Sequence, residues 1–315
     1  MNNEKILIIG ANGQIGTVLT QALRDLYGQD QVIASDLAAV PTMPAGPFET
    51  LDVLNAVRLG EIVRQYGIGQ VYHLAAILSA KGEQHPKWAW EINMGGVFNV
   101  LEAAREYRLK VFFPSSIASF GPFAERQNTP QHGPLEPTTV YGISKVAGEL
   151  WSQYYHLRYG VDVRSLRYPG IISYQSMPGG GTTDYAVDIY HKAVLKEDFT
   201  CFLSAGTRLP MMYMDDAVRA TLSLMDAPAE KVKLRTSYNL AGMSFTPAEI
   251  AAEIQKHYPE FRVSYQPDFR QAIADSWPES IDDADARNDW GWAPQFDLAS
   301  MTAEMLSRLK EKYTR

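Results

Sequence analysis

Cysteine is almost absent from this 315-residue sequence, and long apolar runs are missing altogether. The single cysteine, Cys201, excludes an intramolecular disulfide and fits a reducing compartment. No apolar run reaches the roughly 18 residues that suggest a membrane-spanning helix. The chain starts on "MNNEKILIIG", where an apolar segment leaves no room for a targeting leader. We therefore expect a soluble, cytoplasmic protein that does not bind a membrane.

Positive charge is also scarce, since 29 Lys and Arg face 36 Asp and Glu and the net charge is −7. No basic stripe is visible, so nucleic acid is not expected as a partner. The six histidines are scattered without HExxH or paired Cys/His spacing, and no metal site is predicted. Cys201 lies in the apolar stretch "DFTCFL", which is typical of a buried bystander, although a nucleophile is the alternative.

Apolar runs typical of strands alternate with helical patterns over the first 195 residues. Strands are expected at 5–10, 31–36, 70–76, 110–116 and 161–170, and helices at 14–27, 55–66, 88–107, 140–158 and 184–195. Continuous apolar strands in such an alternation predict an α/β fold, in which helices cover both faces of a parallel sheet. After about residue 235 the pattern changes to isolated strands and helices, which suggests a smaller C-terminal lobe.

The stretch "GANGQIG" places Gly10, Gly13 and Gly16 between a strand and a helix. Such a turn lets the backbone approach a pyrophosphate, and the helix N-terminus supplies N–H donors. Asp36 ends the second strand, where a carboxylate can accept both ribose hydroxyls and would repel a 2′-phosphate. Together these features predict a site for NAD rather than NADP. The alternative for Asp36 is that it caps a loop.

The stretch "YGISK" places Tyr141 and Lys145 four residues apart, on one face of a helix. A nearby ammonium and a positive nicotinamide ring would lower the pKa of the phenol toward neutrality, so that Tyr141 could act as a base. Ser116, at the end of the strand in "PSSIASFG", would hydrogen-bond the reacting oxygen. Ser115 is its rival, and an ordinary surface Tyr/Lys pair is the alternative for "YGISK".

The ordered set of motifs resembles the extended short-chain dehydrogenase/reductase family over nearly the whole chain. It comprises the glycine triplet, "HLAA" (73–76), Asn93 in "INMGGVFNVLEAA", the Ser116–Tyr141–Lys145 set and "MMYMDDAVRA" (211–220). The resemblance implies a Rossmann doubly wound sheet that binds NAD and carries a substrate-binding lobe. It also implies contact of Lys145 with the nicotinamide ribose, a water relay near Asn93, and a homodimer formed through two helices per subunit.

The same resemblance divides the chain and extends the cofactor site. Residues 1–170 are expected to form the NAD-binding domain, with 205–235 packing back onto it, and residues 171–204 and 236–315 to form the lobe. The residues expected to contact NAD are Gly10, Asn12, Gly13, Gln14, Ile15, Gly16, Asp36, Asp52, Val53, Leu74, Ala75, Ala76, Asn93, Tyr141, Lys145 and Tyr168.

Two segments, 166–193 and 275–294, resemble those of the short-chain L-threonine 3-dehydrogenases within this family. The resemblance implies NAD-dependent oxidation of the side-chain hydroxyl of L-threonine to 2-amino-3-oxobutyrate, without a metal. Many other members act on nucleotide sugars and hold the diphosphate with arginine. Here residues 275–289 carry six acids against Arg287 alone. That charge would disfavour a diphosphate, although a solvated acidic face explains the acids equally well.

The loop "MPGGGTTDYA" (177–186) first suggests a phosphate cradle, but the glycine turn at 10–16 already serves the phosphates. We expect the loop to bind the charged ends of an amino acid instead. Backbone N–H groups of 179–181 could form a nest for the carboxylate, and Asp184 could accept the ammonium. The residues expected to contact the substrate are Ser79, Ser116, Tyr141, Gly179, Gly180, Thr182, Thr183, Asp184 and Trp277.

Each of these substrate residues has a structural alternative. Asp184 could be the N-cap of the following helix, Ser79 could also be a helix cap, and Trp277 could simply pack in the lobe. Two other functions also remain open. A nucleotide-sugar epimerase or dehydratase would keep NAD bound and release no net NADH. A catalytically silent NAD-binding regulator is the second, and the presence of Ser116, Tyr141 and Lys145 argues against it.

Overall fold

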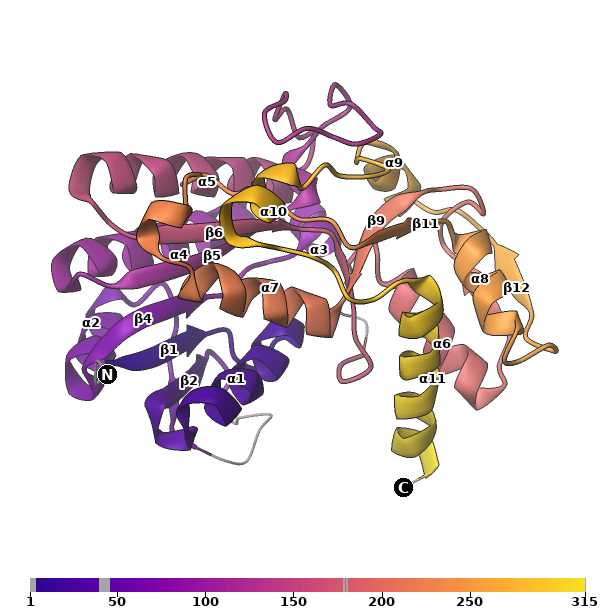
Figure 1. Cartoon of the computed structure of the whole chain (residues 1–315), viewed down its shortest axis with the longest axis horizontal. Coiled ribbons are helices and arrows are strands. Elements are labelled where there is room, and N and C mark those ends of the chain that lie inside the picture. Colours follow the sequence, from indigo (N-terminus) through magenta and orange to yellow (C-terminus); the bar gives the residue numbers. More distant parts are fainter. Residues whose placement is uncertain (1–3, 40–45, 178, 180, 315) are drawn as a thin grey trace.

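The computed structural model describes residues 4–39, 46–177, 179 and 181–314, and its largest element is a seven-stranded parallel sheet (Figure 1). The strands are β1 (Lys5–Ile9), β2 (Val32–Asp36), β3 (Phe48–Thr50), β4 (Ile68–His73), β5 (Lys110–Ser116), β6 (Val163–Tyr168) and β10 (Tyr238–Asn239). Their order is β10-β6-β5-β4-β1-β2-β3. The order 3-2-1-4-5-6 within it is that of the doubly wound Rossmann fold, so the predicted fold class is confirmed.

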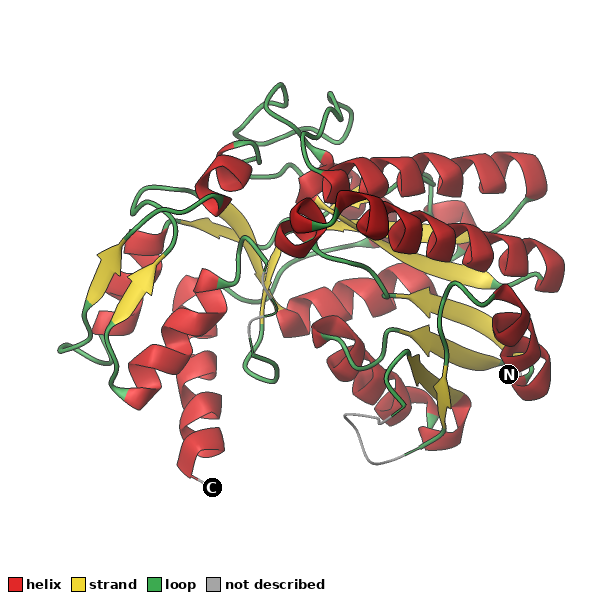
Figure 2. Cartoon of the chain, turned by 180° about the vertical axis from the view of Figure 1, so that it is seen from behind, coloured by secondary structure: helices red, strands yellow, loops and turns green. Residues whose placement is uncertain are grey.

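Helices cover both faces of this sheet (Figures 1 and 2). One face carries α2 (Ala56–Tyr66), α4 (Pro86–Tyr107) and α5 (Val140–Tyr159), and the other carries α1 (Gln14–Tyr27) and α7 (Met214–Asp226). Side chains alternate along a strand, so Leu7 and Ile9 of β1 enter the core on the α2/α4 face. Ile6 and Ile8 enter the core on the α1 face. Burial on both faces explains why the strands are continuously apolar.

A second core lies beside the sheet (Figure 1). Its strands are β7 (Gly170–Ile172), β8 (Phe199–Cys201), β9 (Leu209–Tyr213), β11 (Met243–Phe245) and β12 (Val263–Tyr265), and its principal helices are α6 (Tyr185–Leu195), α8 (Pro247–Gln255), α9 (Arg270–Asp275) and α11 (Leu298–Thr314). Cys201 is buried in this core, where loss of hydration raises the pKa of its thiol to about 11. A thiol so placed fits the bystander interpretation.

Short elements complete the chain. They are α3 (Ser79–Gln84), α10 (Ala284–Trp290) and the 3-10 turns η1 (Gln29–Gln31), η2 (Ile117–Ser119) and η3 (Ala229–Lys231). Among the described residues, no helix combines the length and apolarity required to span a bilayer.

The C-terminal segment after residue 235 contributes to both cores. Strand β10 pairs with β6 in the main sheet, and Ala286 and Trp292 lie in the core beneath α1 and α7. Helices α8 and α11 instead pack against α6 in the second core. The assignment of 236–315 to a substrate-binding lobe, and of 1–170 with 205–235 to an NAD-binding domain, stays a prediction.

Candidate active site

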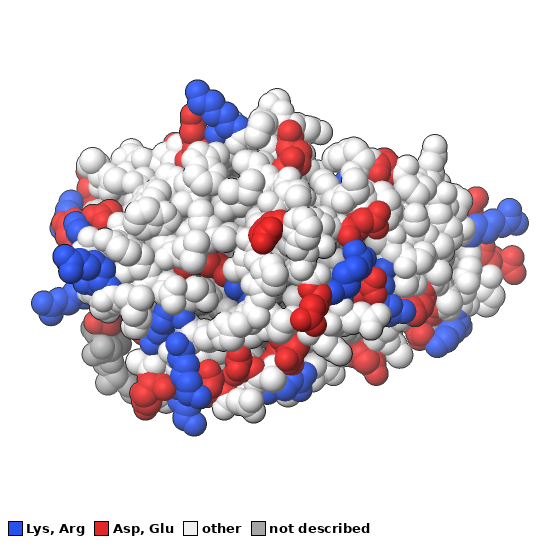
Figure 3. Space-filling model, turned by 90° about the horizontal axis from the view of Figure 1, so that it is seen from above, with Lys and Arg blue, Asp and Glu red and all other residues white. Residues whose placement is uncertain are grey.

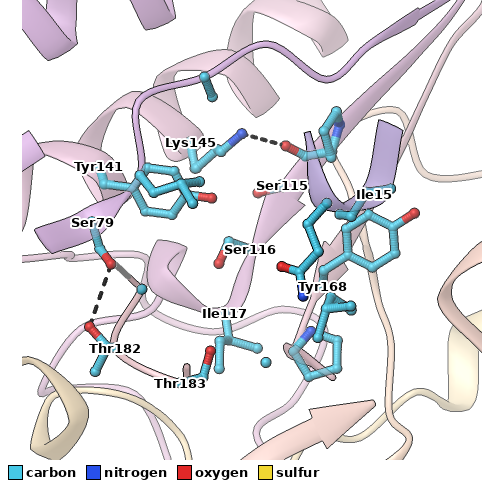
Figure 4. Close-up of a pocket in the computed structure, with 18 of the residues that line it drawn as sticks. Ile15, Ser79, Ser115, Ser116, Ile117, Tyr141, Lys145, Tyr168, Thr182 and Thr183 are labelled. Atoms are coloured by element: carbon cyan, nitrogen blue, oxygen red, sulfur yellow. Dashed lines mark hydrogen bonds between the residues drawn. The ribbon is translucent and has the colours of Figure 1, made fainter. Parts of the chain in front are cut away.

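A cavity of about 240 Å³ opens at the carboxyl ends of β1, β4, β5 and β6. Strand order reverses between β1 and β4, and open α/β sheets bind ligands at such a point. The cavity is lined by Gly10, Gly13, Gln14, Ile15, Gly16, Leu74, Ala76, Leu78, Ser79, Pro114, Ser115, Ser116, Ile117, Tyr141, Lys145, Tyr168, Pro169, Gly170, Ile171, Gly181, Thr182, Thr183, Asp184 and Trp277. It thus brings the predicted catalytic residues together with parts of the predicted cofactor and substrate sites (Figure 4).

The glycine-rich turn after β1 has the close backbone contacts that only glycine permits. Gly10 has a φ of +89°, and a Cβ there would lie 2.7 Å from the backbone nitrogen of Ala75. A Cβ at Gly16 would lie 2.2 Å from the carbonyl oxygen of Gly10. Gly13 is the N-cap of α1 and has no side chain to occupy the helix N-terminus. The turn therefore leaves backbone and helix terminus open to a pyrophosphate.

Asp36 lies beside this turn, as the sequence predicted. One carboxylate oxygen accepts a hydrogen bond from the Asn12 backbone N–H at 3.0 Å, and the other accepts one from Ala38 at 3.2 Å. The second contact is the loop cap that was the alternative for Asp36, and its contact with the ribose of NAD stays a prediction. Gln14 Nε2 is buried without a partner, and Gln14 lines the cavity. An unpartnered donor beside the glycine cradle fits a polar cofactor such as NAD.

The remaining predicted cofactor residues divide into two groups. Ile15, Leu74, Ala76 and Tyr168 line the cavity. Asn12, Asp36, Asp52, Val53, Ala75 and Asn93 are not part of its lining. The Asp52 carboxylate accepts the Leu54 N–H, and Val53 packs where a Cβ on Gly96 would lie. Their contact with NAD stays a prediction.

The predicted catalytic residues come from β5 and the first turns of α5. The Thr139 hydroxyl caps α5 by accepting the Gly142 N–H at 3.1 Å, which begins the helix just before Tyr141. The Lys145 ammonium lies 5.3 Å from the centre of the Tyr141 ring and donates to the Pro114 carbonyl at 2.7 Å. Ser116, at the end of β5, lines the cavity beside Tyr141, and its hydroxyl lowers the pKa of the phenol. Figure 4 shows Ser116 and Tyr141 directed into the same space.

Burial governs the ionisation of Tyr141 and Lys145. Loss of hydration raises the pKa of Tyr141 to about 12, although the hydrogen bond with Ser116 acts in the opposite direction. Burial also lowers the pKa of Lys145 to about 8, while the charge of Glu149 raises it. These values describe the protein without NAD⁺, so the expected lowering of the tyrosine pKa by Lys145 and the nicotinamide ring together stays a prediction. Loss of hydration is the larger of the two effects on the Tyr141 phenol, and the Ser116 hydroxyl is the smaller.

Ser115, the rival of Ser116, faces away from Tyr141. Its hydroxyl donates to the carboxylate of Glu149 and lies 3.0 Å from the Ser119 hydroxyl. Adjacent residues on a strand point to opposite sides, so Ser116 faces the cavity when Ser115 faces Glu149. Sequence reasoning missed Glu149, although it continues the helix face of Tyr141 and Lys145 by one further turn.

Asn93 connects the loop after β4 to α5. Its side chain accepts the Ile77 N–H at 2.7 Å and donates to the Ile77 carbonyl at 3.1 Å. It also donates to the Ser144 hydroxyl at 3.2 Å, and Ser144 donates to the carbonyl of Tyr141 at 2.7 Å. Asn93 thus fixes backbone next to the catalytic tyrosine. Its part in a water relay stays a prediction.

Residues 181–184 of the predicted substrate loop also line the cavity. The Thr182 hydroxyl lies 3.4 Å from that of Ser79, which is itself in α3 rather than at its N-cap (Figure 4). Thr183 packs on Gly170, where a Cβ would approach its Cγ2 to 2.7 Å. Ser79, Thr182 and Thr183 therefore line one wall together.

The glycines and the aspartate of this loop interact with each other. The Gly181 N–H donates to Asp184 Oδ2 at 2.7 Å, and Asp184 makes no side-chain cap to α6 although it occupies the N-cap position. One N–H of the predicted anion nest is thus engaged within the loop. Gly179 does not line the cavity, and Gly180 lies outside the described residues.

The acidic stretch 275–289 sends only Trp277 to the cavity wall. Three of its six acids form ion pairs away from the cavity lining. Glu279 pairs with Arg126, Asp283 with Arg287, and Asp289 with Lys233. None of the six acids lines the cavity, and their effect on a diphosphate stays a prediction. Trp277 packs in the second core and also lines the cavity, so the packing alternative is observed and its part in covering the substrate stays a prediction.

The fold and this site define a Rossmann-type dinucleotide-dependent enzyme with a Ser–Tyr–Lys centre. Residues 6–241 match the NAD dependent epimerase/dehydratase family, and the chain belongs to that family. An uncharacterized epimerase/dehydratase of Staphylococcus haemolyticus is 50% identical over 313 residues, or 98% of each chain. The predicted resemblance to extended short-chain dehydrogenases/reductases and the use of NAD are confirmed.

Solved structures narrow the similarity. A partial consensus L-threonine 3-dehydrogenase is 58% identical over 98% of this chain and 99% of its own, with a TM-score of 0.96. A GalE-like L-threonine dehydrogenase from Cupriavidus necator, in its holo form, is 57% identical over 97% and 100%, with a TM-score of 0.96. A monomeric L-threonine 3-dehydrogenase from a metagenome is 50% identical over 98% and 99%, with a TM-score of 0.95.

Proposed function

We propose that this protein is an L-threonine 3-dehydrogenase, which oxidises the side-chain hydroxyl of L-threonine to 2-amino-3-oxobutyrate and reduces NAD⁺ to NADH. Similarity to threonine dehydrogenases at 50–58% identity over almost the whole chain supports the proposal. The structural observation that carries the proposal is which charged side chains line the cavity. Among the described residues that line the cavity, Lys145 is the one cation, and no arginine is available for a diphosphate.

The glycine turn, Gln14, Asp36 and Tyr168 would hold the cofactor. NAD⁺, when bound, supplies an acceptor for the hydride that leaves the substrate carbon. Ser116 and Tyr141 hold the substrate hydroxyl between them, and Tyr141 as phenolate takes its proton. The C3–O bond becomes a carbonyl as the C3–H electron pair leaves.

Lys145 stabilises the phenolate by its charge. The Pro114 carbonyl fixes the ammonium through a hydrogen bond of 2.7 Å. Proton return from Tyr141 to solvent is proposed to pass by Lys145 and water near Asn93.

We assign the charged ends of threonine to the loop after β7. Ser79, Thr182 and Thr183 present hydroxyls at one wall of the cavity, and Asp184 brings a carboxylate. Hydroxyl and N–H donors suit the substrate carboxylate, and Asp184 suits its ammonium. Because Asp184 already accepts the Gly181 N–H, it is held in place before substrate arrives. Trp277 covers the same space and excludes water.

We further propose that the protein is a cytoplasmic homodimer formed through α4 and α5. These helices pack against each other and leave apolar side chains exposed, including Leu150 at 55% and Leu157 at 76%. Trp90, Trp151 and Tyr154 are also partly exposed there. Figure 3 views the molecule from the side on which α5 lies, and charged side chains are sparse over its left centre. A surface of this kind suits a second copy of the chain.

The test is NADH formation from NAD⁺ with L-threonine, L-allo-threonine, L-serine and UDP-glucose measured side by side. We expect NADH with L-threonine and much less with L-allo-threonine. Inversion at C3 prevents the hydroxyl from reaching Ser116 and Tyr141 while the hydrogen faces the nicotinamide. Interconversion of UDP-glucose without net NADH would instead support an epimerase. No turnover of any substrate would support an NAD-binding regulator.

A further inference from the structure

A buried carboxylate lies directly behind the catalytic residues. Glu149 is completely buried in α5, one helical turn beyond Lys145 and two beyond Tyr141. Its Oε1 accepts hydrogen bonds from the hydroxyls of Ser115 and Ser119, the latter at 3.2 Å. Arg167 of β6 donates to Oε1 at 3.0 Å and to Oε2 at 2.7 Å.

Ser115 and Ser119 flank the catalytic serine on both sides. Ser115 precedes Ser116 in β5, and Ser119 ends the 3-10 turn that follows it. One carboxylate oxygen therefore binds the chain just before and just after Ser116. The Ser116 hydroxyl also accepts the Ala118 N–H at 3.2 Å within the same turn. Together these bonds fix the direction in which Ser116 projects into the cavity.

Arg167, the partner of Glu149, is itself held by further contacts. It is 3% exposed, donates to the carbonyl of Gln131 at 3.1 Å and to Asn239 Oδ1 at 3.0 Å, and lies over the Phe120 ring. Burying such an ion pair is often no more stabilising than apolar packing of the same volume. Stability alone is thus a weak reason for two charges behind the site, whereas precise placement of Ser116 is a direct consequence of them.

We propose that Glu149 is a positioning residue for the reaction: it holds Ser116 toward Tyr141 and keeps the proton of the pair on Lys145. The proposal rests on the proposed oxidation by the Ser116, Tyr141 and Lys145 centre. It assigns to Glu149 no contact with substrate or NAD.

The second effect of Glu149, on the proton shared by Tyr141 and Lys145, follows from its negative charge. Tyr141 and Lys145 lose their first proton as a coupled pair, and the reactive form has a phenolate beside an ammonium. The negative charge of Glu149 raises the pKa of Lys145 and so favours this form over neutral phenol with neutral amine. The other titratable groups nearby are His73 of β4, whose pKa is lowered to about 3 by burial and by Lys145, and Arg167. Tyr168 and Asp184 line the same cavity as Lys145 but are not among the causes of its pKa shift. His73 is neutral at working pH, so Glu149 is the anion that supports the ammonium.

The test compares wild type with Glu149→Gln and Ser115→Ala in single-turnover NADH formation across pH, with saturating NAD⁺ and L-threonine. In Glu149→Gln the pKa of Lys145 falls, so the Tyr141–Lys145 pair loses its first proton at a lower pH. The acid limb of the rate then moves to lower pH, by about 0.5–1 unit. The plateau rate falls about tenfold or more, because the neutral amine form now competes and Ser116 is less well aimed.

Ser115→Ala keeps the Glu149–Arg167 ion pair and removes the hydrogen bond from the Ser115 hydroxyl to Glu149. It should lower the plateau with no shift of the limb and little change in Tm, and it tests the proposal even if Glu149→Gln fails to fold. Asp216→Asn is the matched control, since Asp216 is a buried carboxylate that pairs with Arg219 and is outside the cavity lining. It should lower Tm and leave the limb in place.

Two results would overturn the role of Glu149. One is a folded Glu149→Gln enzyme with an unshifted limb and wild-type plateau, and the other is an Ser115→Ala enzyme with the wild-type rate. Absence of threonine oxidation in the wild type would overturn the proposed function itself, so the two failures are distinct.

Discussion

At the scale of single residues, burial changes the pKa values of both Tyr141 and Lys145, which share the proton that the proposed reaction moves. Burial holds the pKa of Tyr141 near 12 and brings that of Lys145 down to about 8. In the protein without bound ligands the first proton therefore comes from Lys145, and a phenolate beside an ammonium is the minor form of the pair, which sets the pH dependence. The positive charge of an oxidised nicotinamide acts in the same direction as Lys145.

Lys145→Met should remove the positive charge that stabilises the Tyr141 phenolate. Tyr141 then titrates alone, with its pKa raised by burial, and the phenolate fraction falls tenfold for each pH unit below that pKa. The acid limb of single-turnover NADH formation should move to higher pH, and the rate near neutrality should fall by about a hundredfold or more. An unchanged limb would show that the limb belongs to another group.

The sequence predicts Ser116, Tyr141 and Lys145 because their spacing follows from local geometry at a strand end and a helix start. Glu149 and Arg167 escape prediction because their contacts join α5 to β6 across the core. The ionisation of Tyr141 escapes for another reason. Spacing identifies a neighbouring ammonium, whereas the desolvation that opposes it depends on the whole surrounding packing.

At the scale of elements, the loop that carries Trp277 is fastened to a second loop 150 residues earlier. Arg126 pairs with Glu279 at 3.0 Å and donates to the carbonyl of Asp275, so it spans the two sides of Trp277. Thr129 forms a bridge with Ile281 in the same contact. The position of the cavity cover is therefore set by a loop that does not itself line the cavity.

Arg126→Ala should raise the KM for L-threonine about two- to fivefold, the range expected for an exposed ion pair, and leave the KM for NAD⁺ unchanged. Steady-state kinetics with each substrate varied in turn measures both. Arg208→Ala is the matched control, because Arg208 also makes one ion pair and one carbonyl bond, to Glu249 and Ser244. Equal effects of the two variants on the KM for threonine would contradict the fastening role.

At the scale of the molecule, the strands of the main sheet could be predicted from the sequence, because burial on both faces makes them continuously apolar. The C-terminal segment was harder to divide. Strand β10 has two residues, too few for any periodicity, and it enters the main sheet only by pairing with β6. Which core a short segment joins depends on contacts that are distant in sequence, so pattern alone cannot decide it.

The proposed dimer can be tested at the same scale. Leu150→Glu with Leu157→Glu should convert a particle of twice 35.2 kDa into one of 35.2 kDa in sedimentation velocity. Both side chains are exposed on α5, so the fold of one chain is spared while charge enters the proposed interface. Val57→Glu, at a similarly exposed apolar position of α2, should leave the dimer intact. A wild-type protein that sediments at 35.2 kDa would contradict the dimer.

The central claim, that Tyr141 is the base in NAD-dependent oxidation of L-threonine, is tested most directly by Tyr141→Phe. The substitution removes one hydroxyl and keeps the ring in its place beside Lys145. We predict that single-turnover NADH formation from L-threonine falls by about 10²–10⁴-fold, while NAD⁺ binding, followed by calorimetry, stays close to that of the wild type. NADH formation at the wild-type rate in this variant would contradict the account.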